Sequence, residues 1–488
     1  MIDSGADISV FSIVGGVLPN TLKSVNGIGG NQYIGTSEDL LVRFSCNVEK
    51  QYCVRLHQTK IPSRGNLVIL GRDFLRQFNS TEFDWDNGKI RLGDSWLFFM
   101  DSHVKKVNPN LNKQQKDQIF GILEKYPETF ALNPKAPREC STVKHEIKTI
   151  DNKIVQEKVR RLPNKWKSDI DNQVQEMLRN DIIKPSCSPF NSNPLLVSKK
   201  DNTKRFVVDF RGLNKTTMTD RYPLPCVQEL LDQCHNCNFF SQLDMASGYW
   251  GIPIIEQDQP KTAFSVPHGK MQFQRMPFGL KNAQSTFQRN MDQIVEKCKS
   301  MGAKGVDAYV DNCIIYTKTL EEHIFSLDIL LKVLEECNMS LRIDKCEFAY
   351  PQIEFLGFLV DGKTLKPAPS NLEKINQCPV PTSRKKLQSF LGMVNYNRRF
   401  IKNYSDMCSP LNKMTSTKIP FTWTEKEQKA FERIKNELHS ALSLFLPDWS
   451  KPFVMKTDAS QIAVGSVLGQ FNDDGSFQPI GYHSETLS

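Results

Sequence analysis

One short segment, residues 309–316, constrains the fold more than any other. It reads Tyr-Val-Asp-Asn-Cys-Ile-Ile-Tyr, two apolar strand-like pieces joined by an Asp-Asn pair. Such a pair suits a tight turn, so the segment predicts a β-hairpin. A second carboxylate, Asp244, ends the strand-like segment Phe240-Ser241-Gln242-Leu243-Asp244. If both carboxylates meet at one sheet edge, they would repel each other unless divalent cations bridged them, as two-metal nucleotidyl transfer requires. The alternative is an ordinary hairpin turn.

Length and charge narrow the possibilities. The chain has 488 residues, which predicts about three domains, and its 39% hydrophobic content is too high for a disordered chain. The net charge of +9 is concentrated: residues 152–215 carry +7 and residues 362–415 carry +8, while residues 1–100 are neutral. These blocks indicate regions that grip a phosphate backbone, or else a lysine-rich solvated surface.

Cysteine usage and hydropathy argue against disulfide-rich, secreted and membrane-spanning proteins. The 13 cysteines are scattered and odd in number, so a disulfide framework is not expected and a reducing, intracellular setting fits best. Cys234-His235-Asn236-Cys237 suggests zinc, but a second Cys or His pair with suitable spacing is missing, so we expect core or surface thiols. The longest strongly apolar run is residues 96–100, so we expect neither a membrane span nor classical secretion.

The spacing of apolar residues divides the chain into regions of different predicted secondary structure. Residues 1–100 predict short strands with Gly-rich turns, and a helix near 114–125 is followed by a Pro-containing linker. From residue 152 the pattern is α+β. The predicted helical faces are Ile170/Val174/Met177/Leu178, Phe287/Met291/Ile294/Val295, Ile324/Leu327/Leu331/Leu334 and Leu387/Phe390/Leu391/Val394. Predicted strands cover 195–197, 206–208, 313–316 and 452–455, and Thr424-x-x-Glu427 is a helix capping box.

An ordered set of motifs covers residues 150–415. It comprises Lys199-Lys200-Asp201, Arg205, Val208-Asp209-Phe210-Arg211-Gly212-Leu213-Asn214-Lys215, Tyr222-Pro223-Leu224-Pro225, Leu243-Asp244, Ser247-Gly248-Tyr249, Lys261-Thr262-Ala263-Phe264, Met276-Pro277-Phe278-Gly279-Leu280, Tyr309-Val310-Asp311 and Phe355-Leu356-Gly357. In this order the motifs resemble the reverse transcriptase of Gypsy-type LTR retrotransposons. The resemblance implies a right-hand polymerase with fingers, palm and thumb. It also implies template-directed DNA synthesis, with an RNA or DNA template, a primer and dNTPs as partners.

The resemblance also implies roles for single residues. Asp244 and Asp311 would hold two Mg²⁺ ions, with Mn²⁺ as a substitute. Lys199 and Arg205 would contact the incoming triphosphate. The other implied positions are Tyr249 as a steric gate against a 2′-hydroxyl, Phe278 and Gly279 in the nucleotide pocket, and Leu356 and Gly357 in the primer grip.

One position departs from the family's Tyr-x-Asp-Asp pattern. Asn312 keeps a carbonyl oxygen but lacks the negative charge. One charge pair at about 4 Å contributes roughly 4 kcal/mol at an effective dielectric of about 20, which as a transition-state loss slows chemistry on the order of a thousandfold. We therefore expect a crippled or strongly Mn²⁺-dependent polymerase, unless water or Asp307 replaces the missing group.

The N-terminal hundred residues resemble a retropepsin-type aspartic protease. The resemblance rests on Ile2-Asp3-Ser4-Gly5-Ala6-Asp7, Gly27-Ile28-Gly29-Gly30 and Ile69-Leu70-Gly71-Arg72-Asp73-Phe74-Leu75, as catalytic loop, flap and closing helix. It implies Asp3 as the catalytic carboxylate and a homodimer, because two carboxylates must share a proton. Since only two residues precede Asp3, we expect an N-terminally truncated, inactive domain.

The C-terminal residues resemble the opening strands of a retroelement ribonuclease H. The matching segments are Phe453-Val454-Met455-Lys456-Thr457-Asp458-Ala459-Ser460 and Gly465-Ser466-Val467-Leu468, with Asp458 implied as the first metal ligand. Because several carboxylates are needed around two ions, we expect no nuclease activity from a domain that stops at Ser488.

The expected chain is thus multidomain, and its parts follow the resemblance. They are an all-β retropepsin-like unit (1–100), a linker (101–151), reverse transcriptase fingers and palm (152–340), primer grip and thumb (341–415), a connection (416–450) and the start of an α/β ribonuclease H-like domain (451–488). The leading interpretation is a polymerase within a Pol polyprotein, found in a cytoplasmic particle or the nucleus. The alternatives are a catalytically impaired remnant that only binds primer-template, and a free-standing aspartic protease with an unrelated C-terminal region.

Overall fold

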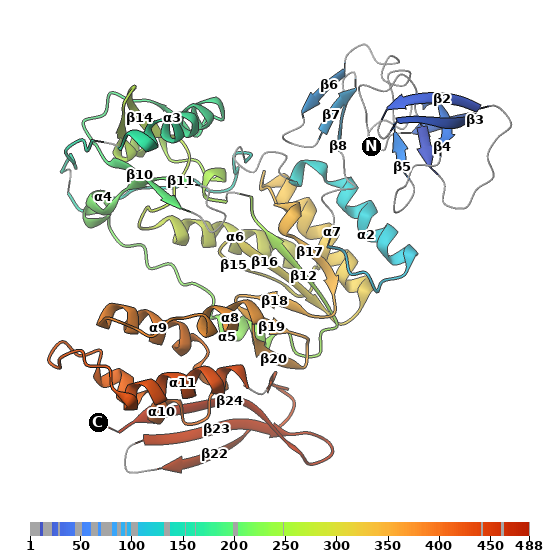
Figure 1. Ribbon diagram of the computed structural model, residues 1–488. Helices are drawn as coiled ribbons and strands as arrows, with labels where there is room; N and C mark the ends of the chain where they lie inside the picture. The colour runs from blue at the N-terminus through green and yellow to red at the C-terminus, as the bar shows by residue number, and fades with distance from the viewer. Residues whose placement is uncertain are drawn as a thin grey trace. The chain divides into compact units, whose positions relative to one another are not determined.

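The computed structural model describes most of the chain beyond residue 105 and a set of strands before it. The described residues are strands between 10 and 98, and residues 106–130, 137–151, 153–161, 163–198, 204–246, 248–440, 443–459 and 463–487. The chain divides into two compact units, Met1–Lys105 and Lys106–Ser488 (Figure 1). Each unit is considered by itself.

The N-terminal unit is described through its strands. They are β1 Val10–Ser12, β2 Leu22–Gly27, β3 Gly30–Arg43, β4 Gln51–Thr59, β5 Leu67–Ile69, β6 Thr81–Asp84, β7 Lys89–Leu92 and β8 Ser95–Phe98. A five-stranded sheet has the order β2-β3-β4-β1-β5, and β6-β7-β8 form a second sheet. Asp3 lies outside the described residues, and so do residues 70–75 of the segment 69–75 predicted as the closing helix, so the protease expectation stays a prediction.

The centre of the second unit is a four-stranded antiparallel sheet, the palm sheet, with the order β15-β16-β12-β17. Its strands are β12 Phe239–Asp244, β15 Val306–Tyr309, β16 Asn312–Thr317 and β17 Glu347–Tyr350. Helices α6 (Ala283–Ser300) and α7 (Leu320–Glu336) pack on it (Figure 1). The faces predicted for these helices are confirmed, because Phe287, Met291, Leu327 and Leu331 are all fully buried.

A second group of elements comes before and between the palm strands. It comprises α3 Asn164–Arg179, β9 Ile183–Pro185, β10 Asn193–Ser198, β11 Lys204–Asp209, α4 Arg211–Thr216, α5 Val227–Asp232, β13 Phe264–Val266 and β14 Gly269–Phe273. Strands β10 and β11 pair as a hairpin, and β13-β14-β9 form a three-stranded sheet. The rings of Phe206 and Phe273 both pack against buried Phe264, which joins the two sheets.

The segment expected to be a linker pairs with this unit. Helix α2 (Lys113–Lys125) matches the helix predicted near 114–125 and begins with a capping box between Asn112 and Gln115. Residues on either side of α2 form isolated bridges, which are Val107–Phe348, Phe130–Leu341, His145–Ile254 and Thr149–Thr217. These bridges, and the clustering of residues from 106 onward with the second unit, place residues of the predicted linker (101–151) against that unit.

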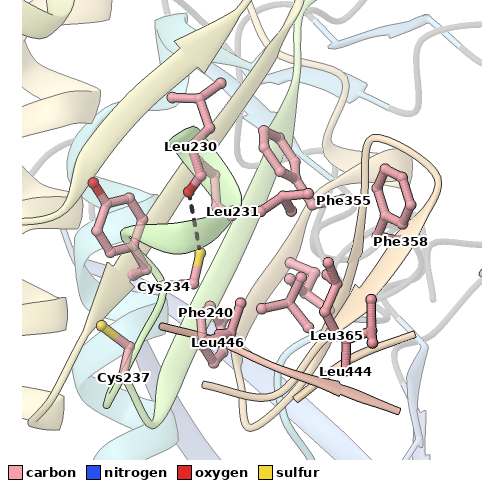
Figure 2. Packing of buried hydrophobic residues seen from close by; sticks show 14 of the residues in the cluster. Leu230, Leu231, Cys234, Cys237, Phe240, Phe355, Phe358, Leu365, Leu444 and Leu446 are labelled. Atoms are coloured by element: carbon pink, nitrogen blue, oxygen red, sulfur yellow. Dashed lines mark hydrogen bonds between the residues drawn. The ribbon is translucent and has the colours of Figure 1, made fainter. Parts of the chain in front are cut away.

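A hydrophobic core joins the palm sheet to the hairpin after it (Figure 2). That hairpin belongs to a sheet of β18 Ile353–Phe355, β19 Phe358–Val360, β20 Thr364–Pro367 and β21 Leu444–Phe445. Cys234 and Cys237 lie in this core, and the Cys234 thiol donates to the Leu230 carbonyl at 3.6 Å. Burial raises the pKa of both thiols, that of Cys237 to about 11. Of the two placements expected, core or surface, both thiols therefore take the core one.

Four helices and a last sheet follow. The helices are α8 Pro369–Asn376, α9 Arg384–Tyr396, α10 Tyr404–Lys413 and α11 Glu425–His439. The capping box predicted from Thr424 and Glu427 begins α11, and the face predicted for α9 is buried against α11 through Phe390 and Phe431. The last sheet contains β22 Val454–Ala459, β23 Ala463–Phe471 and β24 Phe477–Thr486. Among the described residues, no helix is long and apolar enough to cross a membrane.

Candidate active site

Strand pairing brings Asp244 and Asp311 to the same edge of the palm sheet. Asp244, the last residue of β12, pairs with Asn312, the first residue of β16. Tyr309 also pairs with Asn312, so the β15–β16 turn consists of Val310 and Asp311. The N–H of Met245 donates to the Asp311 carbonyl at 3.0 Å and ties the end of β12 to this turn. The hairpin prediction is confirmed, but the Asp-Asn turn is wrong by one residue, because Asn312 belongs to the strand.

The turn has an unfavourable backbone conformation. Val310 takes φ +51° whereas the φ of Asp311 is not positive, and positive φ at the first central residue alone is the mark of a type II′ turn. This conformation is costly for a β-branched residue. Val310 is nevertheless 5% exposed, and its N–H donates to the Gln288 side chain at 2.7 Å. The turn is thus held by its surroundings rather than by its own preference.

The electrostatics of the pair fit a bound cation. Burial raises the pKa of Asp244, and the Asp311 carboxylate raises it further, while Lys345, with Nζ 3.5 Å from Oδ2, and Arg342 oppose the rise. Two carboxylates that disfavour each other's charge at one edge are a hard-oxygen donor set, the type that Mg²⁺ prefers. In the described part of the chain there is no cluster of three or more His, Cys, Asp or Glu side chains that could hold a metal ion.

Asn312 is engaged by its neighbours. Its Nδ2 donates to Asp311 Oδ1 at 3.3 Å, and its Oδ1 accepts from Gln242 Nε2 at 3.4 Å. The amide therefore bridges Asp311 and Gln242 at the position where the family pattern has a second carboxylate.

Asp307 is not placed to replace that carboxylate. Its side chain is largely buried on β15, where it accepts from the Tyr316 hydroxyl and forms an ion pair with Lys299 at 2.8 Å. Both oxygens are occupied by these partners. Asp307, one of the two groups named as a substitute at position 312, is therefore engaged by other partners.

Aromatic rings surround the predicted gate residue. Tyr249 lies in a 3₁₀ turn, Gly248–Gly251, and packs edge-on against Phe278 at 5.0 Å and Phe287 at 5.6 Å. Burial raises the pKa of Tyr249 and the Asp311 charge adds to the rise, so the phenol lies within electrostatic range of the Asp311 carboxylate. Half-buried rings beside two carboxylates form one wall of a site.

Two further predicted residues adjoin this wall. The Arg205 guanidinium lies over the Phe278 ring at 5.0 Å and is exposed. Gly279 takes φ +93°, a conformation that glycine allows. Its carbonyl accepts from Asn214 Nδ2 at 2.8 Å, and Asn214 Oδ1 accepts from the N–H of Lys281 at 3.0 Å. Lys199 lies outside the described residues.

Leu356 and Gly357 form a second strained turn, between β18 and β19. Their φ values, +47° and +78°, are those of a type I′ hairpin turn. The Leu356 carbonyl accepts from the Tyr396 hydroxyl at 2.8 Å, and the Gly357 carbonyl accepts from the N–H of Ala368 at 2.9 Å. The predicted primer grip is therefore a turn tied to helix α9.

Asp458, the predicted ribonuclease H ligand, is exposed on β22. It pairs with Gly465, which pairs in turn with Ser484 on β24. Neither neighbour across the sheet is a carboxylate.

Sequence reasoning missed two residues of the site, Lys345 beside Asp244 and Gln288 beneath the turn. A signal for Gln288 was present, since it is a polar residue three and seven positions before Met291 and Val295 on a buried helical face. Lys345 lies in a short 3₁₀ turn, Ile343–Lys345, without periodicity, so pattern analysis offered no signal.

Comparison with protein families assigns two segments. Residues 197–360 match the reverse transcriptase (RNA-dependent DNA polymerase) family, and residues 423–488 match an RNase H-like domain found in reverse transcriptase. The first match contains Asp244, Asp311, Tyr249, Phe278 and Leu356. The second contains Asp458.

Curated relatives are retrotransposon polyproteins. The chain is 35% identical over 385 residues to the retrovirus-related Pol polyprotein from transposon 297 of Drosophila melanogaster, covering 78% of this chain and 36% of the relative. It is 35% identical over 407 residues to that from transposon gypsy, covering 80% and 38%. It is 35% identical over 320 residues to the transposon Tf2-7 polyprotein of Schizosaccharomyces pombe, covering 65% of this chain and 24% of the relative. The chain thus spans well under half the length of these relatives.

Solved structures share the fold. A foamy viral protease-reverse transcriptase in complex with double-stranded DNA aligns with a TM-score of 0.72 at 22% identity, covering 100% of this chain and 82% of that chain. Another such complex aligns with a TM-score of 0.70 at 25% identity, covering 79% of each. This chain therefore belongs to the reverse transcriptases that carry an RNase H-like domain, and its homologues are gypsy- and Tf2-type retrotransposon Pol polyproteins.

Proposed function

We propose that this chain is the RNA-directed DNA polymerase part of a Pol polyprotein, acting on a primed RNA or DNA template with dNTPs. The observation that carries the proposal is the meeting of Asp244 and Asp311 at one edge of the palm sheet, joined by the Met245–Asp311 hydrogen bond. Family membership and likeness to reverse transcriptases bound to double-stranded DNA support it.

Asp244 and Asp311 would hold the Mg²⁺ ions, or Mn²⁺ in their place. When bound, the ions supply Lewis-acid activation of the primer 3′-hydroxyl and charge stabilisation of the leaving pyrophosphate. Lys345 keeps positive charge beside Asp244, which favours the ionised carboxylate that a cation needs.

The aromatic wall would select and orient the nucleotide. Tyr249, fixed between Phe278 and Phe287, has little freedom to withdraw, so a 2′-hydroxyl would collide with a rigid ring. Arg205, whose guanidinium lies over the Phe278 ring, would meet the triphosphate, together with Lys199. Asn214 would keep the backbone at Gly279 open to the base pair by bonding both sides of that loop.

The basic block of residues 362–415 would contact the nucleic acid backbone. It falls on helices α8, α9 and α10 and their connections, and Lys385 and Lys386 on α9 are exposed. Contacts of this kind hold a duplex without reading its sequence and weaken as salt rises. The Leu356–Gly357 turn, tied to α9, would hold the primer terminus.

A second candidate function is that of a disabled copy that binds primer-template without extending it. Asn312 favours it, because its amide bridges Asp311 and Gln242 where the family pattern has a charge. The protease, with Asp3 and a homodimer, and the ribonuclease H, with Asp458, stay predictions.

Primer extension by the full chain in Mg²⁺ and in Mn²⁺ tests these functions. Extension in Mg²⁺ that Asp244→Ala abolishes would support a working polymerase. Extension only after Asn312→Asp, with a gain on the order of a thousandfold in kcat, would identify a disabled copy. Asp344→Asn is the matched control, because it removes a neighbouring carboxylate that pairs with Arg342. No extension by any variant, with duplex binding absent too, would contradict both functions.

A further inference from the structure

Gln288 is a buried polar residue directly beneath the Val310–Asp311 turn. It lies on α6 with an exposed fraction of 0%. Its Oε1 accepts from the N–H of Val310 at 2.7 Å, and its Nε2 donates to the Ala308 carbonyl at 3.2 Å. One amide group therefore binds the backbone of β15 and of the turn that follows it.

A second residue of α6 fixes the orientation of this amide. Gln288 Nε2 also donates to Asp292 Oδ1 at 2.7 Å, and the other Asp292 oxygen accepts from the Tyr222 hydroxyl at 2.7 Å. A carboxylate only accepts, so the Gln288 amide must direct Nε2 toward Asp292 and Oε1 toward Val310. Tyr222, from the Tyr-Pro-Leu-Pro motif, thus acts on the turn through two intermediates.

The bond to Val310 matters because the turn is strained. Without the Gln288 oxygen, the Val310 N–H would be buried without its partner and would carry its full desolvation penalty. That cost would add to the positive φ of a β-branched residue, and the turn would relax. Asp311 is the next residue, so its carboxylate would lose its fixed place beside Asp244.

We propose that Gln288, oriented by Asp292 and Tyr222, is a positioning residue that holds the Val310–Asp311 turn in its strained form and thereby places the Asp311 carboxylate. The functional half of this proposal, that the placed Asp311 carboxylate serves catalysis, rests on the proposed polymerase function. The structural half, a turn held by Gln288, does not.

Hydrogen exchange in the full chain tests the structural half. Gln288→Met keeps the length and burial of the side chain but removes both polar atoms. We expect exchange at the Val310 amide to become about tenfold faster, without change at the far end of α6. Asp292→Ala should give a smaller acceleration at the same amide. Gln293→Met, an exposed glutamine of the same helix, should give none.

A buried control separates positioning from general loosening of the helix. Asn290 is also fully buried on α6, but its side chain bonds Thr142 and Met339 instead of the turn. Asn290→Leu should accelerate exchange around residues 140–142 and leave Val310 protected. If Gln288→Met leaves Val310 protected, or acts as Asn290→Leu does, the proposal is overturned.

Steady-state kinetics test the functional half, in the parent chain or in the Asn312→Asp chain if only that one extends primers. Gln288→Met should lower kcat about tenfold to a hundredfold, raise the Mg²⁺ concentration for half-maximal rate, and change KM for dNTP less than about threefold. A rise in KM at constant kcat would count against positioning of Asp311. If no chain extends primers, the polymerase function fails while the exchange result still decides whether Gln288 holds the turn.

Discussion

The two strained turns of the second unit are built alike but held differently. Val310–Asp311 and Leu356–Gly357 are both two-residue hairpin turns in which a large aliphatic residue takes positive φ. The first is held by Gln288, a fully buried side chain of a helix packed on the palm sheet. The second is held by Tyr396, a side chain 48% exposed on α9.

This difference separates two tasks. A turn fixed from within the palm keeps its geometry whatever α9 does, which suits a carboxylate that must not move. A turn bonded to α9 follows that helix, which would suit the primer grip proposed for Leu356 and Gly357. The contrast makes predictions that differ for the two turns.

The largest effects are expected at the glycines that close the two hairpins. Gly305, before β15, has φ +59°, and a Cβ there would lie 1.7 Å from the Tyr316 carbonyl oxygen. Gly362, after β19, has φ +79°, and its Cβ would lie 1.9 Å from the Cys237 oxygen. Each Gly→Ala change should lower the free energy of unfolding by about 3 kcal/mol or more, measured by urea unfolding.

Gly392→Ala on α9 is the matched control, because no atom lies within 4 Å of the added Cβ. It should raise the free energy of unfolding by about 0.5–1 kcal/mol, the helix preference for alanine. Equal and small effects at all three glycines would contradict the backbone contacts described for the two hairpins.

The free energy of unfolding is expected to depend on pH through one buried histidine that bonds two strands of the palm sheet. His323 is fully buried and bonds Ser241 on β12 at 2.6 Å and Thr317 on β16 at 3.0 Å. Burial lowers its pKa to about 3. The unfolded chain binds a proton below about pH 6.5 and the folded chain does not, so stability is complete above that pH and falls toward pH 3.

For this histidine, the free energy of unfolding is expected to fall by about 1.4 kcal/mol for each unit by which the pH is lowered. This fall should be measured as the slope of the free energy of unfolding against pH between 6 and about 4, in the parent and in His323→Gln. Burial also lowers the pKa of His145, to about 4, so part of the slope should remain in the variant. An unchanged slope would show that His323 does not stay neutral in the folded chain.

Much of the polymerase unit follows from sequence pattern. The buried faces of α6, α7 and α9 were predicted because an apolar residue every three or four positions defines a helical face on its own. The β15–β16 hairpin and the place of Asp244 at a strand end were also predicted from a few neighbouring residues. The capping box at Thr424 likewise needs only four residues.

The rest depends on contacts between distant residues. The turn falls on Val310–Asp311 because pairing with β12 places Asn312 in the strand, and the local sequence, which favours Asp-Asn, does not contain that information. The sequence alone does not indicate that the Asp307 carboxylate has partners, but the fold places Tyr316 and Lys299 in contact with it. Residues 106–150 look like a linker in composition, yet their bridges reach residues such as Thr217 and Phe348.

A smaller effect is expected at the second turn. Tyr396→Phe removes the hydroxyl that donates to the Leu356 carbonyl but keeps the ring stacked on Phe358 at 5.1 Å. Because the bond is partly exposed, we expect a loss of about 0.5–1 kcal/mol in unfolding free energy and a rise of a few fold in Kd for a primed duplex. Exchange at Val310 should not change.

The control for Tyr396→Phe is Tyr350→Phe, which removes a hydroxyl at the opposite end of β12 from Asp244. It should leave duplex affinity unchanged. A Tyr396→Phe chain with parental affinity would mean that α9 does not hold the Leu356–Gly357 turn.

The smallest expected effect is the coupling between the two turns. Gln288 bonds Val310, Ala308 and Asp292, whereas Tyr396 bonds Leu356, so the two side chains share no partner. A double-mutant cycle of Gln288→Met and Tyr396→Phe should therefore give an interaction energy below about 0.5 kcal/mol. One route could raise it, because Tyr309 packs with Leu356 against the same core and lies within electrostatic range of Tyr396. A larger coupling that disappears in a Tyr309→Phe background would show that the palm turn senses α9 through the Tyr309 hydroxyl, and the separation of the two turns would be wrong.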